Sequence, residues 1–294
     1  MRSLVSVPAL HLGSRSFSPD ERLIMAIINR TPDSFYDAGL TFTDERAMAA
    51  VDAAVAAGAE IVDVGGVKAG PGDAVDLNEE LRRTVDFVAA IRDRHPAVLI
   101  SVDTWRHEVG EAVCRAGADL LNDAWGGHDP ELAHVAAHFD VGLVCTHTGG
   151  ATPRTRPHRV AYEDVVGSVV DFLGQETARA EAAGVNRQRI LVDPGHDFGK
   201  NTRHSLAVTR VLDQLLALGR PLLVSLSNKD FVGESLDAPV GNRLIGTLAA
   251  TAISSWLGAQ VFRVHEVPET RAVLAMVQAI AGSAEPSVAR RGLA

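Results

Sequence analysis

The stretch Ile190-Leu191-Val192-Asp193-Pro194-Gly195 joins a short apolar run to a carboxylate and then to a Pro-Gly turn. Continuous apolar runs of this length are typical of strands that are buried on both faces of a parallel sheet. In a parallel barrel the carboxyl ends of such strands converge on one mouth, where active sites form. Similar runs that finish in polar residues occur at Ile61-Val62-Asp63, Leu99-Ile100-Ser101-Val102-Asp103, Leu120-Leu121-Asn122-Asp123 and Val261-Phe262-Arg263.

Eight strand-like runs alternate with helical segments along the chain. We expect strands at 23–28, 61–64, 98–102, 120–121, 141–145, 190–192, 221–225 and 261–264. We expect helices at about 43–58, 78–94, 106–116, 130–138, 162–183, 203–218, 240–257 and 268–281. Strands that alternate with helices predict a parallel sheet, and eight such units favour a closed (β/α)8 TIM barrel over an open sheet.

The pattern continues without a visible internal boundary. We therefore expect a single domain over 1–294, with the barrel at about 20–282 and a disordered tail at 283–294. The segment 4–10 is short and contains Pro8, so it predicts an N-terminus of the folded chain and not a signal peptide. No apolar run approaches the roughly 20 residues that a membrane-spanning helix requires.

Composition and charge narrow the classes of function. The chain has 294 residues, of which 46% are hydrophobic and 22% charged, as is usual for globular proteins. Its 37 acidic and 28 basic residues give a net charge of −9, which argues against nucleic acid as the main partner. Only two cysteines are present, Cys114 and Cys145, so no disulfide framework is implied and a reducing, cytoplasmic setting is expected.

Polar side chains stand at or just beyond most of the expected strand ends. Carboxylates and an amide can match the donors and acceptors of a flat nitrogen heterocycle, whereas Lys, Arg and His can hold phosphate oxygens. A single Asp at a strand end often caps the following helix instead. Recurrence around a barrel favours a ligand site, and the residues concerned are Asn29, Asp63, Asp103, Asn122, Asp193, Lys229, Arg263 and His265.

These motifs resemble those of the dihydropteroate synthase family, in the family's order, over about residues 23–267. The resemblance therefore covers nearly the whole chain and includes several separate loops. The matching segments are Asn29-Arg30-Thr31-Pro32-Asp33-Ser34-Phe35, Asp63-Val64-Gly65-Gly66, Ser101-Val102-Asp103-Thr104, Asn122-Asp123, Asp193-Pro194-Gly195 with Phe198-Gly199-Lys200, and Arg263-Val264-His265.

The resemblance implies a reaction in which a pterin bearing a methylene diphosphate is joined to p-aminobenzoate. Diphosphate leaves first, and the arylamine then attacks the electron-poor methylene carbon. It implies a catalytic group of Asp103, Asp193 and Lys229. The implied substrate-binding residues are Asp103, Asn122, Asp193 and Lys229 for the pterin and Arg263 and His265 for the diphosphate, with Asn29 as a ligand of Mg²⁺.

Several loops depart from the family pattern. Where family members usually have Glu-Ser-Thr-Arg-Pro-Gly, this chain reads Val67-Lys68-Ala69-Gly70-Pro71-Gly72. The usual Ser-Arg-Lys-Ser is Ser227-Asn228-Lys229-Asp230, so that Asp230 adds a negative charge near the expected carboxylate of p-aminobenzoate. The usual Met-His-Met is Thr146-His147-Thr148, and Asp-Gly-Gly is Asp37-Ala38-Gly39. Since the loss of one preorganised donor typically costs about 10²–10³ in rate, we predict a divergent paralogue that is weak or inactive.

Three alternatives stay open at this point. The protein could be an active synthase in which Lys68, or the basic loop Arg154–Arg159, replaces the lost loop residues. It could be a pterin-binding methyltransferase domain of the same superfamily, although those usually lack the features at Lys229 and Arg263 to His265. It could also be a non-catalytic pterin-binding or partner protein. Family members commonly form homodimers through late helices, where Trp256 would fit.

Overall fold

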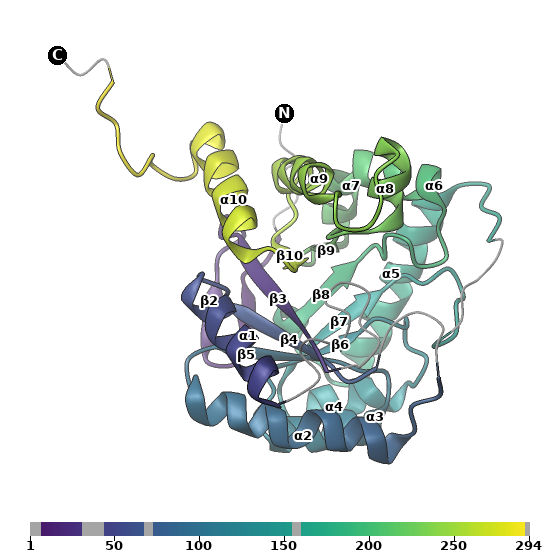
Figure 1. Cartoon of the computed structure of the whole chain (residues 1–294). Helices are drawn as coiled ribbons and strands as arrows, with labels where there is room; N and C mark the ends of the chain where they lie inside the picture. The colour runs from purple at the N-terminus through teal and green to yellow at the C-terminus, as the bar shows by residue number, and fades with distance from the viewer. Residues whose placement is uncertain (1–6, 31–43, 68–72, 155–159, 292–294) are drawn as a thin grey trace.

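A computed structural model describes residues 7–30, 44–67, 73–154 and 160–291 of the chain. Eight parallel strands form one sheet in the order β8-β7-β6-β5-β4-β3-β10-β9, and helices surround it (Figure 1). The ends of the sheet also meet, because Val192 N donates to Pro221 O at 3.0 Å and Val192 bridges Leu222. The strands are β3 Leu23–Asn29, β4 Ile61–Gly65, β5 Leu99–Asp103, β6 Leu120–Asp123, β7 Gly142–Thr146, β8 Ile190–Asp193, β9 Leu223–Ser225 and β10 Val261–Val264.

This arrangement confirms the predicted (β/α)8 barrel. The helices are α1 Asp44–Ala56, α2 Leu77–Arg94, α3 His107–Arg115, α4 Glu131–His138, α5 Val165–Ala182, α6 Thr202–Arg210, α7 Leu212–Leu215, α8 Asp230–Leu236, α9 Leu244–Trp256 and α10 Val267–Ala281, with short 3₁₀ turns η1 Arg187–Arg189 and η2 Leu216–Leu218. Most of the long helices bury apolar side chains against the sheet, whereas α9 buries Thr and Ser side chains. In α2, for example, Asp76 accepts a capping hydrogen bond from Glu79 N, and Phe87, Val88 and Ile91 are buried.

Two helix predictions need correction. The helix expected over 203–218 is broken at Val211 into α6, α7 and η2. The helix expected from residue 240 begins at Leu244 and is preceded by α8, a short helix that was not predicted. Since α8 has only 7 residues, its apolar pattern is too short to distinguish it from a turn.

The N-terminal segment forms an antiparallel hairpin of β1 Leu10–Leu12 and β2 Arg15–Phe17. Its side chains Leu10, Leu12 and Phe17 are buried against the inward-facing residues of the barrel strands. We call this hairpin the plug. A Cβ built on Gly142 would lie 2.5 Å from Leu12, so the missing side chain at Gly142 leaves room for the plug. The hairpin therefore closes the end of the barrel opposite the mouth. The inward-facing residues in this cluster are Leu23, Met25, Ile61, Leu99, Leu120, Val144, Leu191, Leu223 and Val261.

Alternation along the strands decides which residues face the mouth. Side chains at i and i+2 of a strand share one face. The positions two or four residues after the inward-facing residues that contact the plug therefore also point inward. Outward-facing neighbours such as Val62, Val102 and Val192 pack instead against the helices. The inward positions near the carboxyl ends are Asp63, Ser101, Asp103, Asn122, Thr146, Asp193 and Arg263.

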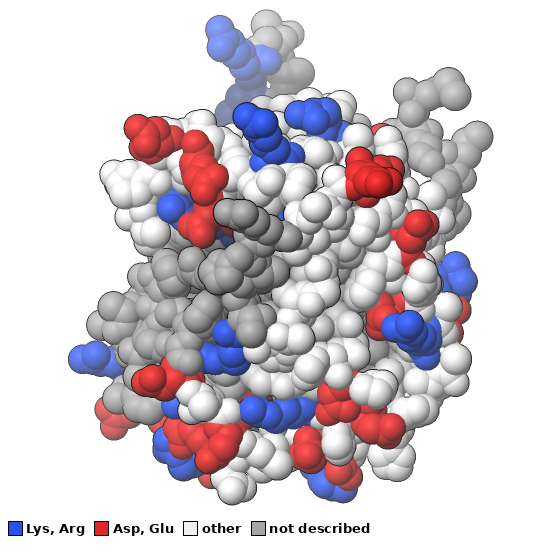
Figure 2. Space-filling view, turned by 90° about the vertical axis from the view of Figure 1, so that its right-hand side faces the viewer, with Lys and Arg blue, Asp and Glu red and all other residues white. Residues whose placement is uncertain are grey.

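The residues that follow α10 lie outside the barrel. α10 ends at Gly282, whose φ is 70°, and residues 283–291 extend away from the barrel without helix or strand (Figure 1). On the face in Figure 2, basic and acidic side chains are interspersed. None of the helices in the described ranges has the length and apolar character that crossing a membrane demands.

Candidate active site

Arg263 lies at the centre of an ionic network in the barrel mouth. Its Nε lies 2.6 Å from Asp63 Oδ2, and its Nη2 lies 3.1 Å from Asp103 Oδ2. The two carboxylates come from β4 and β5, and Arg263 comes from β10, so the network spans strands far apart in sequence. The predicted anion-binding Arg263 and the predicted ring-binding Asp103 are therefore in direct contact.

Asp63 connects this network to Asn122. The Asp63 side chain is completely buried and accepts a 2.6 Å hydrogen bond from Ser101 Oγ. Asn122 Nδ2 lies 3.3 Å from Asp63 Oδ2, so one carboxylate orients both an amide and a guanidinium. The sequence analysis recognised Asp63 at a strand end but gave it no role. The alternation of side chains along β4, which puts Asp63 on the same face as Ile61, was the sequence signal for an inward carboxylate.

Burial and neighbouring charge set the electrostatics of the mouth. Burial raises the pKa of Asp103 to about 7, and the Arg263 guanidinium opposes this rise. Burial also raises the pKa of Asp193, while the Lys229 ammonium acts in the opposite direction. A carboxyl group with a raised pKa can accept hydrogen bonds when it is charged or donate one when it is protonated. Such a pair can match the mixed donors and acceptors of a nitrogen heterocycle.

Lys229 reaches the mouth from the N-cap position of α8. Its Nζ donates to the His196 carbonyl and lies 4.9 Å from the centroid of the Phe198 ring. Burial lowers the pKa of the Lys229 ammonium, whereas Asp197 and Asp193 raise it. Lys229 is thus held between an aromatic face and two carboxylates, on the same side of the mouth as Asp193.

A tight turn after β8 fixes Asp193. Gly195 has φ 65°, and its N–H donates to Asp193 Oδ1 at 2.7 Å. A Cβ at Gly195 would collide with the His147 carbonyl oxygen, so only glycine fits there. Buried Lys200 strengthens the same turn, because its Nζ donates to Gly195 O at 3.0 Å and to His147 O at 3.2 Å.

His265 lies just beyond β10 and contacts the loop after β9. Its Nδ1 lies 2.8 Å from Ser227 Oγ, which also donates to Glu266 Oε2 at 3.0 Å. Asn228 Nδ2 donates to Glu266 Oε1 at 3.0 Å. The structure therefore places His265 two residues from Arg263 but in a separate hydrogen-bonded group.

The charge of Asp230 is compensated in the structure. Asp230 Oδ1 pairs with Arg243 Nη1 at 2.9 Å, and its side chain is 61% exposed. The expected repulsion between Asp230 and a substrate carboxylate is therefore largely screened by Arg243 and by solvent. Asp230 therefore weighs less in the case for reduced activity than its charge alone suggests.

An aromatic cluster covers one side of the mouth. Trp105 and Trp125 meet edge to face with centroids 6.2 Å apart, and Trp125 contacts Phe198 in the same way at 5.5 Å. Val67 and Ala151 are buried against the two tryptophans. We call these five residues the mouth cluster. Val67 belongs to the altered second loop, so the first residue of that loop is a hydrophobic anchor.

Other predicted loop residues are only partly described. Lys68, Arg156 and Arg159 lie outside the described residues. Arg154 donates to the backbone carbonyl of Asp73. This contact joins the loop after β7 to the loop after β4. In the described part of the basic loop, Arg154 therefore binds another loop of the same chain.

The predicted metal ligand Asn29 ends β3. A Cβ built on Gly65 would be 3.9 Å from both Asn29 Oδ1 and Asp103 Cβ, which places these two side chains on either side of Gly65. The Asn29 amide oxygen is a ligand of the kind that Mg²⁺ prefers, and this ion usually retains several waters or phosphate oxygens as well.

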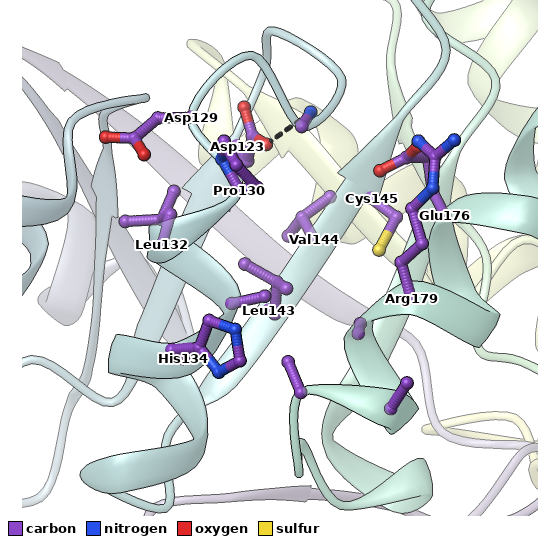
Figure 3. Close-up of a pocket in the computed structure, with 15 residues that line it drawn as sticks. Asp123, Asp129, Pro130, Leu132, His134, Leu143, Val144, Cys145, Glu176 and Arg179 are labelled. Atoms are coloured by element: carbon purple, nitrogen blue, oxygen red, sulfur yellow. Dashed lines mark hydrogen bonds and ion pairs between the residues drawn. The ribbon is translucent and has the colours of Figure 1, made fainter.

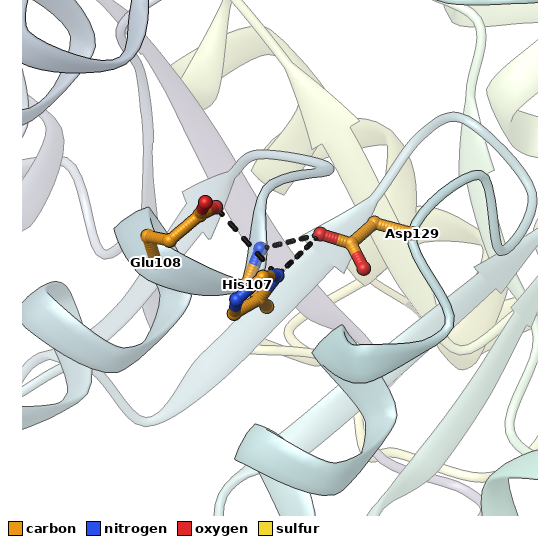
Figure 4. A group of neighbouring side chains, drawn as sticks. All are labelled: His107, Glu108 and Asp129. Carbon is orange, nitrogen blue, oxygen red and sulfur yellow. Dashed lines mark hydrogen bonds and ion pairs between the residues drawn. The ribbon is translucent and has the colours of Figure 1, made fainter.

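A second group of possible cation ligands lies outside the mouth. His107, Glu108 and Asp129 form the one such group found among the described residues (Figure 4). Asp129 Oδ2 accepts from His107 N at 2.9 Å and lies 2.8 Å from His107 Nδ1. Asp129 Oδ1 accepts from Glu131 N at 3.1 Å. Asp129 therefore caps the starts of α3 and α4, which accounts for the cluster without a metal.

Comparison with known proteins identifies the family. The sequence profile described as "Pterin binding enzyme" matches residues 25–265. The chain belongs to this family. It is 56% identical over 287 residues to a Mycobacterium leprae protein named "Inactive dihydropteroate synthase 2", covering 96% of this chain and 99% of that protein. It is 36% identical over 263 residues to the Escherichia coli dihydropteroate synthase, covering 89% of this chain and 93% of the relative.

Solved structures agree with this assignment. The Yersinia pestis dihydropteroate synthase, solved in a sulfonamide drug complex, superposes with a TM-score of 0.89 at 33% identity, covering 94% of this chain and 100% of that one. The pterin-binding family member described here is therefore a divergent homologue of dihydropteroate synthase with the same barrel. The predicted resemblance is confirmed.

Proposed function

We propose that this protein binds a pterin-type ring in the barrel mouth but condenses pterin diphosphate with p-aminobenzoate weakly or not at all. Asp103 and Asn122 lie in one network with Arg263, while Asp193 and Lys229 interact electrostatically on the adjoining side. A carboxylate can accept two parallel hydrogen bonds from a guanidine-like ring edge. This set of donors and acceptors supports ring recognition.

The buried side chain of Val67 is the main support for the proposed loss of condensation activity. Val67 is 7% exposed and packs into the mouth cluster, at the position where the family resemblance leads us to expect a glutamate. The altered loop therefore starts with an apolar anchor and offers fewer polar side chains to the reacting carbon. The name of the Mycobacterium leprae relative, which is 56% identical, supports the same conclusion for this chain.

Diphosphate recognition would use Arg263, which lies in β10, and His265, which lies just beyond its end. Mg²⁺ would fit beside Asn29 and would supply positive charge to the diphosphate. Of the catalytic residues we propose, Asp193 and Asp103 would hold ring N–H groups and Lys229 would donate to a ring acceptor. We also propose a cytoplasmic setting, because both cysteines are free and buried.

Calorimetry and a turnover assay test the proposal together. Purified protein is titrated with pterin diphosphate and Mg²⁺, and dihydropteroate formation is then measured with p-aminobenzoate present. We expect saturable pterin binding and a rate at least about 10²-fold below that of the Escherichia coli synthase assayed in parallel. Turnover at the rate of the Escherichia coli enzyme would disprove the loss of activity. Absence of pterin binding would disprove ring recognition.

A loop replacement tests whether the altered loop, and not the other residues of the mouth, limits the condensation reaction. The variant carrying Val67→Glu, Lys68→Ser, Ala69→Thr and Gly70→Arg restores the family's side chains. If the altered loop limits the reaction, this variant should raise the condensation rate by about 10-fold or more, with pterin affinity little changed. An unchanged rate would indicate that other mouth residues limit the reaction.

A homodimer is the second part of the proposal. Ile245, Ile253 and Trp256 on α9 and Met276 and Ile280 on α10 are exposed, and the two helices pack side by side, so we call these five residues the apolar stripe. A large exposed apolar patch usually marks an interface. Sedimentation velocity of the purified protein tests the assembly, and a monomer at micromolar concentration would refute it.

A further inference from the structure

A cavity lies outside the barrel, between α4 and α5 and behind β6 and β7 (Figure 3). Its volume is about 530 Å³, which is within the usual range for small-molecule sites. Leu132, Ala133, Leu143 and Ala180 contribute apolar walls. The sheet separates this cavity from the mouth, because Asn122 points inward while the next residue, Asp123, points outward.

Two carboxylates, Asp123 and Glu176, each lie against Gly127, where the chain turns at one end of the cavity. Asp123 Oδ2 accepts from Gly127 N at 2.7 Å, and Asp123 Oδ1 accepts from Trp125 N at 2.9 Å. A Cβ at Gly127 would collide with Glu176 Oε2, so the Glu176 carboxylate also lies against this glycine. Gly127 has φ 69° as well. Glycine is therefore favoured at position 127 for two reasons, its positive φ and the Glu176 carboxylate that lies against it.

The charge at this end of the cavity is incompletely balanced. Asp123 is 6% exposed, and within the described ranges its hydrogen bonds come from backbone N–H groups and not from a cation. Glu176 pairs with Arg179, whose side chain is 70% exposed. Asp129 lies at the rim and is engaged by His107. Burial raises the pKa of Asp123 to about 7, and the charge of Glu176 adds to the rise.

We propose that this cavity binds a small organic cation, a primary ammonium or amidinium group carried on a short apolar body. The cationic group would donate hydrogen bonds to Asp123 and Glu176, each of which retains acceptor capacity beyond the contacts described. The apolar body would lie against Leu132, Leu143 and Ala180. An anion would be repelled by both carboxylates, and a bare metal ion would find apolar walls in place of further oxygen ligands.

Matched probes test the charge that the cavity selects. Benzylamine, benzyl alcohol and benzoate share one ring and differ in the charge of the attached group. Protein NMR titrations at pH 7.5 should show saturable benzylamine binding, with shifts at residues around Cys145 and Gly127. Benzyl alcohol should bind at least about 10-fold more weakly, because it lacks a charge-assisted hydrogen bond. Benzoate should bind most weakly of the three.

Variants locate the binding site. Asp123→Asn should reduce benzylamine affinity at least about 10-fold, since a charged partner is lost. Asp171→Asn, an equal change at an exposed position on helix α5, which also carries Glu176, should leave the affinity unchanged. Ala133→Phe should block the cavity by volume and serves as the second variant if Asp123→Asn fails to fold. Circular dichroism establishes the fold of each variant.

Three outcomes would overturn the proposal. These are equal affinity for benzylamine and benzyl alcohol, no saturable benzylamine binding, and benzylamine binding that survives both Asp123→Asn and Ala133→Phe. None of these measurements involves the mouth or its ligands. The proposal can therefore fail while ring binding in the mouth stands, and the reverse also holds.

Discussion

At the residue scale, Asp63 is the side chain on which the mouth depends most. It is completely buried and joins Arg263 to Asn122. In Asp63→Asn, the guanidinium keeps Asp103 but loses its shorter ion pair, so we expect about 3 kcal/mol of destabilisation. Because Arg263 and Asn122 lose their fixed orientations, pterin diphosphate affinity should fall at least about 10-fold.

Urea denaturation and calorimetry measure these two effects. Ser101→Ala is the matched control, because it removes one hydrogen bond to Asp63 but no charge. It should cost about 1 kcal/mol. If both variants lose the same stability and affinity, the ion pair has no special role in positioning Arg263.

Asp123 makes a prediction about pH. Burial raises its pKa to about 7 in the folded protein, so the folded state retains a proton that the unfolded state releases near the ordinary carboxyl pKa. The stabilising effect of this proton is fully present below the ordinary pKa and is lost as pH rises through 7. Asp123→Asn cannot titrate. The stability of the native protein relative to this variant should therefore fall between about pH 4 and pH 8, by up to about 4 kcal/mol.

The measurement is the free energy of unfolding of both proteins in urea at pH 5, 6, 7 and 8. Other titrating groups are shared and cancel in the difference. The Asp171→Asn variant carries the same substitution at an exposed position and serves as the control. A flat difference between the native protein and Asp123→Asn would mean that Asp123 is ionised at all these pH values.

At the element scale, the N-terminal hairpin shows what the sequence analysis could not supply. Its strands β1 and β2 have 3 residues each, too few for an alternation pattern. The barrel strands were predictable because long apolar runs recur with helices between them. The hairpin is ordered by contacts with residues as distant as Val261, and no local pattern encodes such contacts.

Truncating Leu12 tests the importance of the plug. Leu12 is fully buried and lies against Gly142. Leu12→Ala should cost about 2–5 kcal/mol, because it leaves a cavity that glycine cannot fill. Ser16→Ala, an exposed change in the same hairpin, should stay within about 0.5 kcal/mol. Thermal unfolding of both variants checks this, and equal melting temperatures would show that the hairpin adds little stability.

At the scale of the whole molecule, the sequence placed the strand ends at one mouth but did not show how their side chains pair. Eight strand ends in a barrel imply a shared mouth, so Asp103, Asn122 and Asp193 could be grouped from their positions alone. The pairing of Arg263 with Asp63 depends on side-chain reach between β10 and β4, which adjoin opposite edges of β3. The neutralisation of Asp230 by Arg243 likewise required three-dimensional contacts.

The proposed dimer makes a prediction that concerns the whole molecule. Trp256 is 55% exposed at the end of α9, beside the exposed Ile253. Trp256→Glu places a charge in the apolar stripe, and burying an unpaired charge in an interface costs several kcal/mol. The dimer dissociation constant should therefore rise at least about 100-fold, while the monomer stays folded because the side chain is already solvent-facing. Sedimentation velocity over a range of concentrations measures this.

Leu206→Glu, on α6, is the matched control, since Leu206 is 38% exposed and lies outside the stripe. Equal dissociation constants for the two variants would place the interface elsewhere.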